Sequence, residues 1–441
     1  MKNMTEAAPM VEKAIAVTPA QAAASRLKQR YAAERRFKAL GISAIVLALG
    51  FLALLLVTIL SNGLTAFVQT NIRVDVTLDA ETLGVDPVKP SADALAAANY
   101  GQVIKNAMYK AFPTVESRPE RRQLAALVSS GADVGLRKML VANPSLLGST
   151  QSVWLVADDD VDMAMKGHIT RTAGAEGSRL TDAQLGWLDA LEKKGDVAKK
   201  FNTALFTVGD SREPEQAGLW GAVVGSFFSL SITLLVCFPL GVATAVYLEE
   251  FAPKNRWTDL IEVNINNLAA VPSVVFGLLG LAIFLNFFGF PRSAPLVGGL
   301  VLALISLPTI IIAGRAAMKA VPPSIREAAL GLGASKLQMV TDHVLPLSMP
   351  GILTGTILGM AHALGETAPL LMIGMVAFIV DIPASPLDPS AVLPVQVYLW
   401  ADSPERAFVE RTSAAIMVLL FFLGMMNVVA ILLRKKFERR W

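Results

Sequence analysis

Six long apolar runs, each able to cross a bilayer as a helix, constrain the fold of this chain more than any other feature. The hydrocarbon core of a membrane accommodates a helix of about 20 apolar residues. Backbone groups inside that core must be hydrogen-bonded within the protein, which favours helices. We therefore predict six transmembrane helices. The runs cover residues 40–60, 219–248, 268–288, 295–313, 350–380 and 414–433.

The composition excludes several other classes of protein. Only 17% of the 441 residues are charged and 54% are hydrophobic, whereas ordinary soluble domains carry about 25% charged residues. A formal net charge of +3 does not indicate a nucleic-acid partner. A single cysteine, Cys237, allows no internal disulfide, and the three scattered histidines do not predict a structural zinc site.

Lysine and arginine at the chain's ends predict the orientation of the helices. Basic residues precede the first run, within 26–38, and follow the last one, within 434–440, whereas the loop 381–411 is mostly acidic. Because basic loops stay in the cytoplasm, both termini should be cytoplasmic. We expect a cytoplasmic arm (1–38), an uncleaved first helix (39–60) and a cytoplasmic basic tail (435–441) in a multi-pass membrane protein.

The long segment 61–217 has no spanning run and should lie outside as an α+β domain, since about 155 residues suffice for one. Helices are expected at 93–112 and 182–199, each opening on an aspartate that can cap it. Strands are expected at 73–78, 152–156 and 204–208. The fold class is thus an all-α polytopic membrane protein with an extracytoplasmic α+β domain inserted between the first span and the five helices of 218–434.

The cytoplasmic loop at about 315–349 carries the clearest functional signal. Ser324 and Glu327 have capping-box spacing, which predicts a helix start. Gly331 and Gly333 permit a sharp turn, and a second helix, 335–344, should run up to Pro346. The expected product is a short helix–turn–helix with small residues that leave room for a partner.

This loop resembles the EAA loop of ABC-importer permeases. Although Glu-Ala-Ala alone is a common helix-forming triplet, the glycine and the Leu-Pro pair match the family's spacing as well. The matching positions are Glu327, Ala328, Ala329, Gly333, Leu345 and Pro346. His343 departs from the family's branched apolar residue. In this family the loop inserts into a cleft of a separate ATPase subunit.

Two further segments, 267–281 and 365–371, resemble phosphate-importer permeases of the PstA type, and the similarity covers about residues 215–441. The resemblance implies the MetI-like permease fold, a location in a bacterial inner membrane and the partners of such an importer. These are a second homologous permease (PstC type), two ATPase subunits (PstB type) and a periplasmic phosphate-binding protein (PstS type), in contact with membrane lipid. This chain lacks a P-loop motif, so it should need no cofactor, have no catalytic residue and leave ATP to the ATPase.

Glu366 places a carboxylate inside the fifth apolar run, where a charge costs about 3 kcal/mol and is a functional-site hypothesis by default. His362 lies at i−4, on the same helix face. We assign His362, Glu366, Thr367 and Pro369 to the translocation pathway, and expect Pro272 and Pro369 to kink their helices. Related permeases should carry an arginine near His362. Alternatively, Glu366 is only a tether between helices, hydrogen-bonded to the partner permease, and does not contact substrate.

Other readings remain open. An importer of another anion or an organic solute, a secondary transporter and a membrane-anchored sensor are the rival functions. Glycines at 351, 355 and 359, and small residues on the second span, indicate ordinary helix packing. The acidic run Asp158–Asp160, with Asp162, lacks EF-hand spacing and is interpreted as a solvated turn, so no metal site is predicted.

Overall fold

The computed structural model describes residues 19–87, 90–171 and 179–437. The parts of the predicted cytoplasmic arm and tail at 1–18 and 438–441 therefore lie outside the described residues. The chain forms two compact units, which divide after Thr58. In the first unit the helix α1 (Pro19–Gly63) begins and carries an apolar segment long enough to span a membrane, as predicted for the first run.

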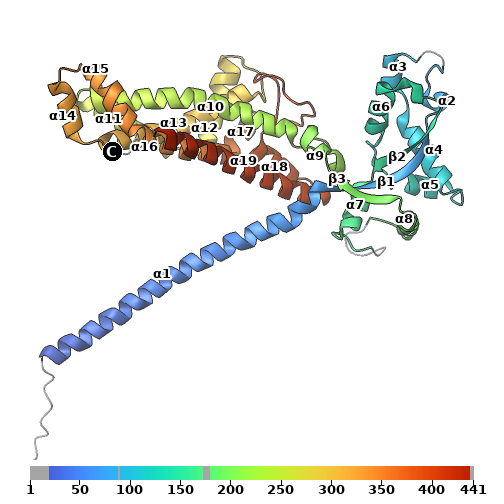
Figure 1. The fold of residues 1–441 in the computed structure, drawn as a ribbon, viewed down its shortest axis with the longest axis horizontal. Coiled ribbons are helices and arrows are strands. Elements are labelled where there is room, and N and C mark those ends of the chain that lie inside the picture. The colour runs from blue at the N-terminus through green and yellow to red at the C-terminus, as the bar shows by residue number, and fades with distance from the viewer. Residues whose placement is uncertain (1–18, 88–89, 172–178, 438–441) are drawn as a thin grey trace, which may run out of the picture. The chain divides into compact units, whose positions relative to one another are not determined.

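The inserted segment contains a three-stranded antiparallel sheet (Figure 1) in the order β2-β1-β3. The strands are β1 (Val68–Thr77), β2 (Thr150–Val156) and β3 (Val197–Phe201). Ile72 of the central strand lies opposite Leu155 on one side and Val197 on the other. The strands predicted at 73–78 and 152–156 are therefore confirmed, as parts of β1 and β2.

The third strand was predicted wrongly. Helix α8 (Asp182–Lys194) ends at Gly195 in a left-handed conformation, φ 75°, which terminates helices readily. The strand β3 follows at once, where the sequence predicted the end of the helix. Residues 204–208 instead contain the helical turn α9 (Ala204–Thr207). The side chain of Asn202 accepts a hydrogen bond from the Leu205 backbone at 3.2 Å and so favours that turn.

The helix predicted at 93–112 is two helices, and the aspartate caps are wrong. Ser91, Asn99 and Thr181 cap α3, α4 and α8, because their side-chain oxygens reach the backbone N–H groups of the first turn. The helices before α8 are α2 (Ala80–Leu83), α3 (Ala92–Ala97), α4 (Tyr100–Ala111), α5 (Arg118–Ala125), α6 (Asp133–Ala142) and α7 (Asp159–Lys166).

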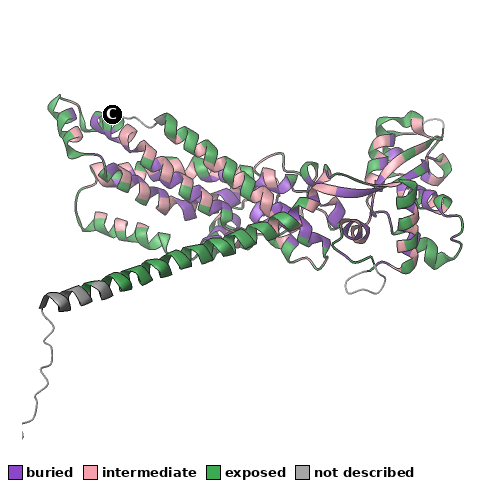
Figure 2. Ribbon diagram, turned by 60° about the horizontal axis from the view of Figure 1, so that its bottom comes forward, coloured by how far each residue is buried: buried purple, intermediate pink, exposed green. Residues whose placement is uncertain are grey.

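The core of the inserted segment lies between one face of β1 and these helices. Ile72, Val74 and Val76 point into it and pack with Met108 and Leu188. Figure 2 shows buried residues concentrated here and in the bundle of long helices that follows. The predicted domain boundaries stay predictions, because residues from Ile59 onward form one compact unit.

Long helices dominate the rest of the chain (Figure 1). They are α10 (Trp220–Val246), α13 (Pro295–Lys319), α16 (Leu345–Gly365) and α19 (Ala407–Phe437), with the shorter α18 (Leu393–Ala401) before the last. The described residues contain five helices long and apolar enough to cross a membrane, and a sixth candidate that is a bent pair. Several membrane-length helices are thus confirmed.

The third predicted span is the bent pair rather than a straight helix over 268–288. Helix α11 (Arg256–Ala269) and helix α12 (Ser273–Gly280), which continues as a π-helical segment to Phe287, meet at 100°. Pro272 lies at the break. Proline has no N–H to donate, and it disfavours a helical conformation at the residue before it.

The fifth predicted span, 350–380, is displaced along the sequence. The membrane-length helix runs from Lys336 to Gly365. Glu366 leaves the helix with ψ 111°, and only the short helix α17 (Ala368–Met372) follows. Glu366 therefore lies at the end of a helix and not near its middle. The kink expected at Pro369 is therefore wrong: the helix already ends at Glu366, and Pro369 lies in the first turn of α17, where its missing N–H costs no hydrogen bond.

Small residues let α16 approach α13 closely, as their spacing predicted. A Cβ atom built on Gly351 would lie 2.6 Å from the Cβ of Ala317, and one on Gly355 would overlap Ala313. On α10, the hydroxyl of Thr233 donates to the Gly299 carbonyl at 3.0 Å. Such close approaches stabilise helix pairs in lipid through van der Waals contact.

Gly355→Ala should destabilise the protein, because the new methyl group overlaps Ala313. Overpacking costs about 1–3 kcal/mol, partly offset by the higher helix propensity of alanine, about 1 kcal/mol. Thermal unfolding in detergent should show a lower Tm. Gly424→Ala on α19 is the matched control, since no atom lies within 4 Å of its Cβ position. An equal effect of both variants would contradict the packing account.

Candidate functional site

The loop between α13 and α16 forms the helix–turn–helix that the sequence predicted. Helix α14 (Pro323–Gly331) is followed by a turn in which Gly333 has φ 88°, a conformation that favours glycine. Helix α15 (Lys336–Gln338) then begins and continues through a π-helical segment, Met339–Val344, into α16.

Two local predictions for this loop are wrong. Ser324 does not cap α14, because the helix starts at Pro323, whose missing N–H suits the first helical position. The second helix does not stop at Pro346 but continues as α16. The wider π-helical segment comes directly before this proline, where the regular hydrogen-bond pattern must change. The capping box is found instead at Ser335 and Gln338, where α15 starts.

The loop has a buried side and an open side. Ala329, Val340 and Val344 pack against residues of α10 and α13 in one apolar cluster. Glu327 and Ala328 are exposed, as are two leucines at the tip, Leu332 at 90% and Leu337 at 62%. The Glu-Ala-Ala motif is therefore divided: its last alanine holds the loop to the long helices, whereas its first two residues lie on an open surface.

Arg326 anchors this loop, and sequence analysis did not identify it. Its Nε and Nη2 donate to Glu250 Oε1 at 3.1 and 2.8 Å, and its Nη1 and Nη2 donate to the carbonyls of Val321 and Met318. Glu250 is only 7% exposed. Charge-assisted bonds of this kind are roughly twice as strong as neutral ones. Arg326 therefore ties α14 both to the end of α13 and to the segment after α10.

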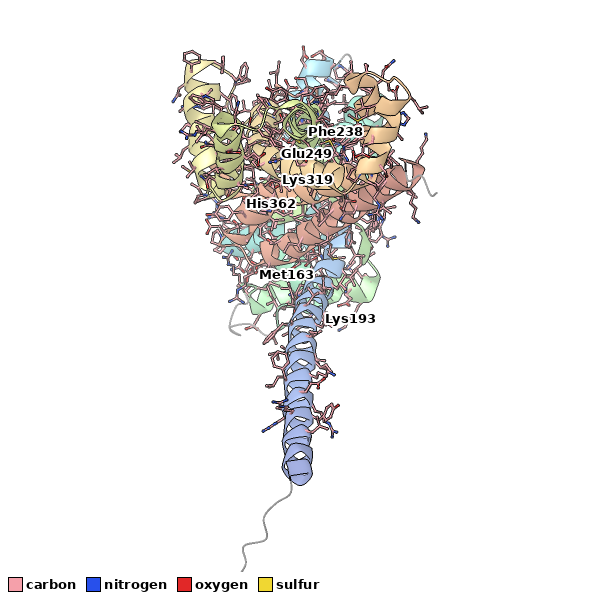
Figure 3. The ribbon with its side chains drawn as sticks, turned by 90° about the vertical axis from the view of Figure 1, so that its left-hand side faces the viewer. Met163, Lys193, Phe238, Glu249, Lys319 and His362 are labelled. Atoms are coloured by element: carbon pink, nitrogen blue, oxygen red, sulfur yellow. The ribbon has the colours of Figure 1, made fainter. Side chains whose placement is uncertain are left out.

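A second ion-pair group lies where α13 ends. Arg315 contacts Glu262 of α11 at 2.5 Å and Glu249 at 3.6 Å. Lys319 also lies 3.6 Å from Glu249, and Figure 3 shows these two residues close together. Sequence analysis missed these ion pairs. The signal for them was the acidic pair Glu249–Glu250, which lies on the same predicted side of the membrane as Arg315 and Lys319.

The predicted pair inside the apolar region is present. His362 Nε2 lies 3.1 Å from Glu366 Oε1, and the side chains are 62% and 18% exposed. Figure 3 labels His362 on α16. Thr367 and Pro369 follow at the start of α17, as the sequence placed them, but Glu366 now lies where the helix breaks.

The second break in the apolar region packs against the first. A Cβ atom at Gly277 of α12 would lie 2.7 Å from the Cα of Pro369. Helix α12 follows the Pro272 break, and α17 follows the Glu366 break, so the two interrupted segments cover each other. Irregular backbone at membrane depth is tolerated where protein or a water-filled cavity surrounds it.

The two groups of predicted residues stand at opposite ends of one helix. Leu345 and Pro346 begin α16, and His362 and Glu366 end it. At 1.5 Å per residue the separation is about 30 Å. The structure does not bring the loop residues and the His362–Glu366 pair together, but the helix α16 connects them. Among the described residues, only Asp158, Asp159 and Asp160 group closely enough to hold a metal ion, and they belong to neither group.

Comparisons with protein families match both halves of the chain. Residues 238–441 match the family described as "Binding-protein-dependent transport system inner membrane component". Residues 24–175 match a domain of unknown function, DUF3333.

Curated relatives match mainly over half of the chain. The "Phosphate transport system permease protein PstA 1" of Mycobacterium tuberculosis is 32% identical over 229 residues, which is 52% of this chain and 74% of that protein. The PstA permease of Haemophilus influenzae is 29% identical over 51% of this chain and 78% of its own length. The probable ABC transporter permease YqgI of Bacillus subtilis is 37% identical over 35% of this chain and 52% of its own.

Among solved structures, the chain is similar to inward-facing conformations of the MetNI methionine ABC transporter. The TM-score is 0.39 at 15% identity, over 50% of this chain and 95% of that one.

Proposed function

This chain belongs to the family of PstA-type permeases of phosphate transport systems, and from that premise we propose that it forms part of the pathway of an ATP-driven importer of inorganic phosphate. It is a permease subunit of a binding-protein-dependent transporter, located in the inner membrane. One observation supports the ATP-driven mechanism. Glu327 and Ala328 are exposed on α14, in the loop from which the long helix α16 leads to Glu366.

The proposed topology has six spans with both termini in the cytoplasm. Five continuous helices and one bent pair are compatible with that number. Basic residues at both ends of the chain and acidic ones at 381–411 favour this orientation. The segment 61–217, with its three-stranded sheet, would then lie outside as the extracytoplasmic α+β domain.

The proposed coupling runs through the loop. A separate ATPase subunit grips the open side of α14, with Glu327 and Ala328 in its cleft and the exposed tip leucines covered. Docking of the ATPase subunit would remove the exposed side chains of Leu332 and Leu337 from water, which favours binding. Movement of the gripped loop reaches α16 because Arg326 and the apolar cluster around Ala329 hold α14 to the long helices.

The proposed pathway passes the break at the end of α16. A carboxylate repels a phosphate anion, so Glu366 would orient a cation, His362 or one from the partner permease, rather than contact substrate. Thr367 and Pro369 line the same break. Alternating access is then a shift between outward-open and inward-open populations, driven by binding that differs between them.

The proposed assembly contains the chain, a PstC-type permease, two PstB-type ATPase subunits and a PstS-type binding protein.

Phosphate uptake by cells should be unaffected by excess sulfate or molybdate and reduced by unlabelled phosphate. Competition by sulfate or molybdate instead would assign the importer to another anion.

Glu327→Arg should abolish ATP-dependent phosphate uptake, because the reversed charge blocks docking of the ATPase while the helix stays folded. Uptake of labelled phosphate is measured in a strain whose only copy carries the variant. The control is Glu116→Arg, an equal charge reversal at an exposed position outside the loop. Normal uptake by Glu327→Arg, at normal membrane levels, would refute the coupling role.

Glu366→Gln should lower the rate of phosphate uptake at least about tenfold, which corresponds to an increase of about 1.4 kcal/mol in the activation free energy of transport. Assembly with the ATPase should survive. The amide keeps the shape of the side chain but removes the charge that faces His362. Uptake and co-purification of the ATPase are measured together. Full uptake by the variant would show that the charge of Glu366 has no role in transport. Loss of co-purification with the ATPase would show that Glu366 has only a structural role.

A further inference from the structure

An apolar groove runs between α10 and α19, at the end of these helices where the inserted segment joins them. Its volume is about 690 Å³. Every lining side chain is aliphatic, aromatic or a thioether, among them Val224 and Phe227 of α10 and Met417, Phe421 and Met425 of α19. Phe227, Phe421 and Met425 are at least half exposed, so the groove is open to its surroundings.

The surroundings of this groove are hydrocarbon. Its α10 residues lie within the apolar run 219–248, and its α19 residues lie within the run 414–433. From Met417 to Met425 the groove follows about 12 Å of α19. One leaflet contributes about 15 Å to the hydrocarbon core. Voids of this size do not stay empty in packed surroundings, and the dimensions fit one acyl chain.

A stack of three aromatic rings extends one wall of the groove to the inserted segment. Phe206 belongs to α9, between β3 and α10 (Figure 1), and Phe67 belongs to the 3-10 turn Leu64–Phe67 before β1. Both line the groove, with ring centroids 5.8 Å apart. Phe206 also stacks on Phe201 of β3, at 6.0 Å, and Phe201 is 62% exposed. Since aromatic side chains gather at the boundary between hydrocarbon and headgroups, this stack indicates the level of that boundary.

A cation lies just beyond the aromatic stack. Lys199 precedes Phe201 by two residues of β3, so both side chains point to the same face of the sheet, about 7 Å apart along the strand. Lys199 is exposed. Lys200 points to the opposite face, where its Nζ lies 3.9 Å from the centroid of the Trp154 ring.

Lys199 has no anionic partner among the described residues. The residue opposite it on β1 is Thr70. Asp162 accepts the N–H of Thr70 at 2.8 Å, but its other carboxylate oxygen is already paired with Lys166 at 2.7 Å. The ammonium group of Lys199 is therefore available to an anion at the level of the headgroups.

We propose that the groove binds one acyl chain of an anionic phospholipid, with the lipid phosphate at Lys199. The acyl chain fills the space between α10 and α19 and gains van der Waals contact with the groove walls. The headgroup reaches β3, so one lipid molecule contacts both the inserted segment and the permease helices. A neutral phospholipid has the same acyl chain but lacks the net charge that Lys199 attracts. This site does not depend on the identity of the transported anion.

Quenching of Trp220 fluorescence tests the proposal, because Trp220 lines the groove and is 44% exposed. The full chain, purified with its accompanying subunits, is reconstituted in phosphatidylcholine vesicles. These contain equal fractions of either brominated phosphatidylglycerol or brominated phosphatidylcholine. The signal of Trp220 is the difference from Trp220→Phe. Brominated phosphatidylglycerol should quench it with about fivefold higher apparent affinity, the effect of one basic residue near a headgroup.

Lys199→Gln should remove this selectivity, so that both brominated lipids quench Trp220 equally. Lys105→Gln, a change at an exposed lysine on α4, is the matched control and should keep the selectivity. Val224→Phe should weaken quenching by both lipids, because the larger side chain fills part of the groove.

Four results would each overturn the proposal. They are equal quenching by both lipids in the unaltered protein, unchanged selectivity in Lys199→Gln, unchanged quenching in Val224→Phe, and no quenching of Trp220 by either lipid. The last result is expected if a helix of a second permease subunit covers the groove. All four concern lipid contact and leave the proposed transport function untouched.

Discussion

Backbone hydrogen bonding in lipid is the constraint on which the rest of this structure depends. A chain inside the hydrocarbon core must stay helical unless other protein covers its free backbone groups. Two of the apolar runs predicted as spans are interrupted. The run 268–288 breaks at Pro272, and the run 350–380 breaks at Glu366. The segments after the two breaks, α12 and α17, pack together through Gly277 and Pro369. The two breaks in the helical backbone therefore lie side by side. The pair of His362 and Glu366, which the sequence predicted, lies at one of them.

The opposite end of α16 serves a different purpose. There the helix begins at a loop whose inner side is fixed by Arg326 and by apolar contacts of Ala329. The outer side, with Glu327, stays open. One helix, about 30 Å long, leads from this loop to the break at Glu366. This arrangement is the physical basis of the proposed coupling between an external motor and the pathway.

The sequence predicted features that depend on neighbours along the chain. The apolar runs, the left-handed Gly333 and the i,i+4 pair of His362 and Glu366 are examples. Features that depend on distant contacts were missed or misplaced. Pro272 indicated a kink, but the 100° bend depends on what α12 packs against. Arg326 with Glu250, and Arg315 with Glu262, join residues far apart in sequence. The strand β3 was misplaced because Gly195 ends α8 early, in favour of pairing with β1.

The central claim is that residues 322–346 face the cytoplasm and offer a surface to a separate motor. Leu332, 90% exposed at the loop tip, is the position to test. The single native cysteine, Cys237, is buried, so Leu332→Cys adds one accessible thiol. A membrane-impermeant maleimide should label this thiol in inside-out vesicles and not in intact spheroplasts, and bound ATPase should reduce the labelling. Labelling from the outer side of spheroplasts would contradict the account.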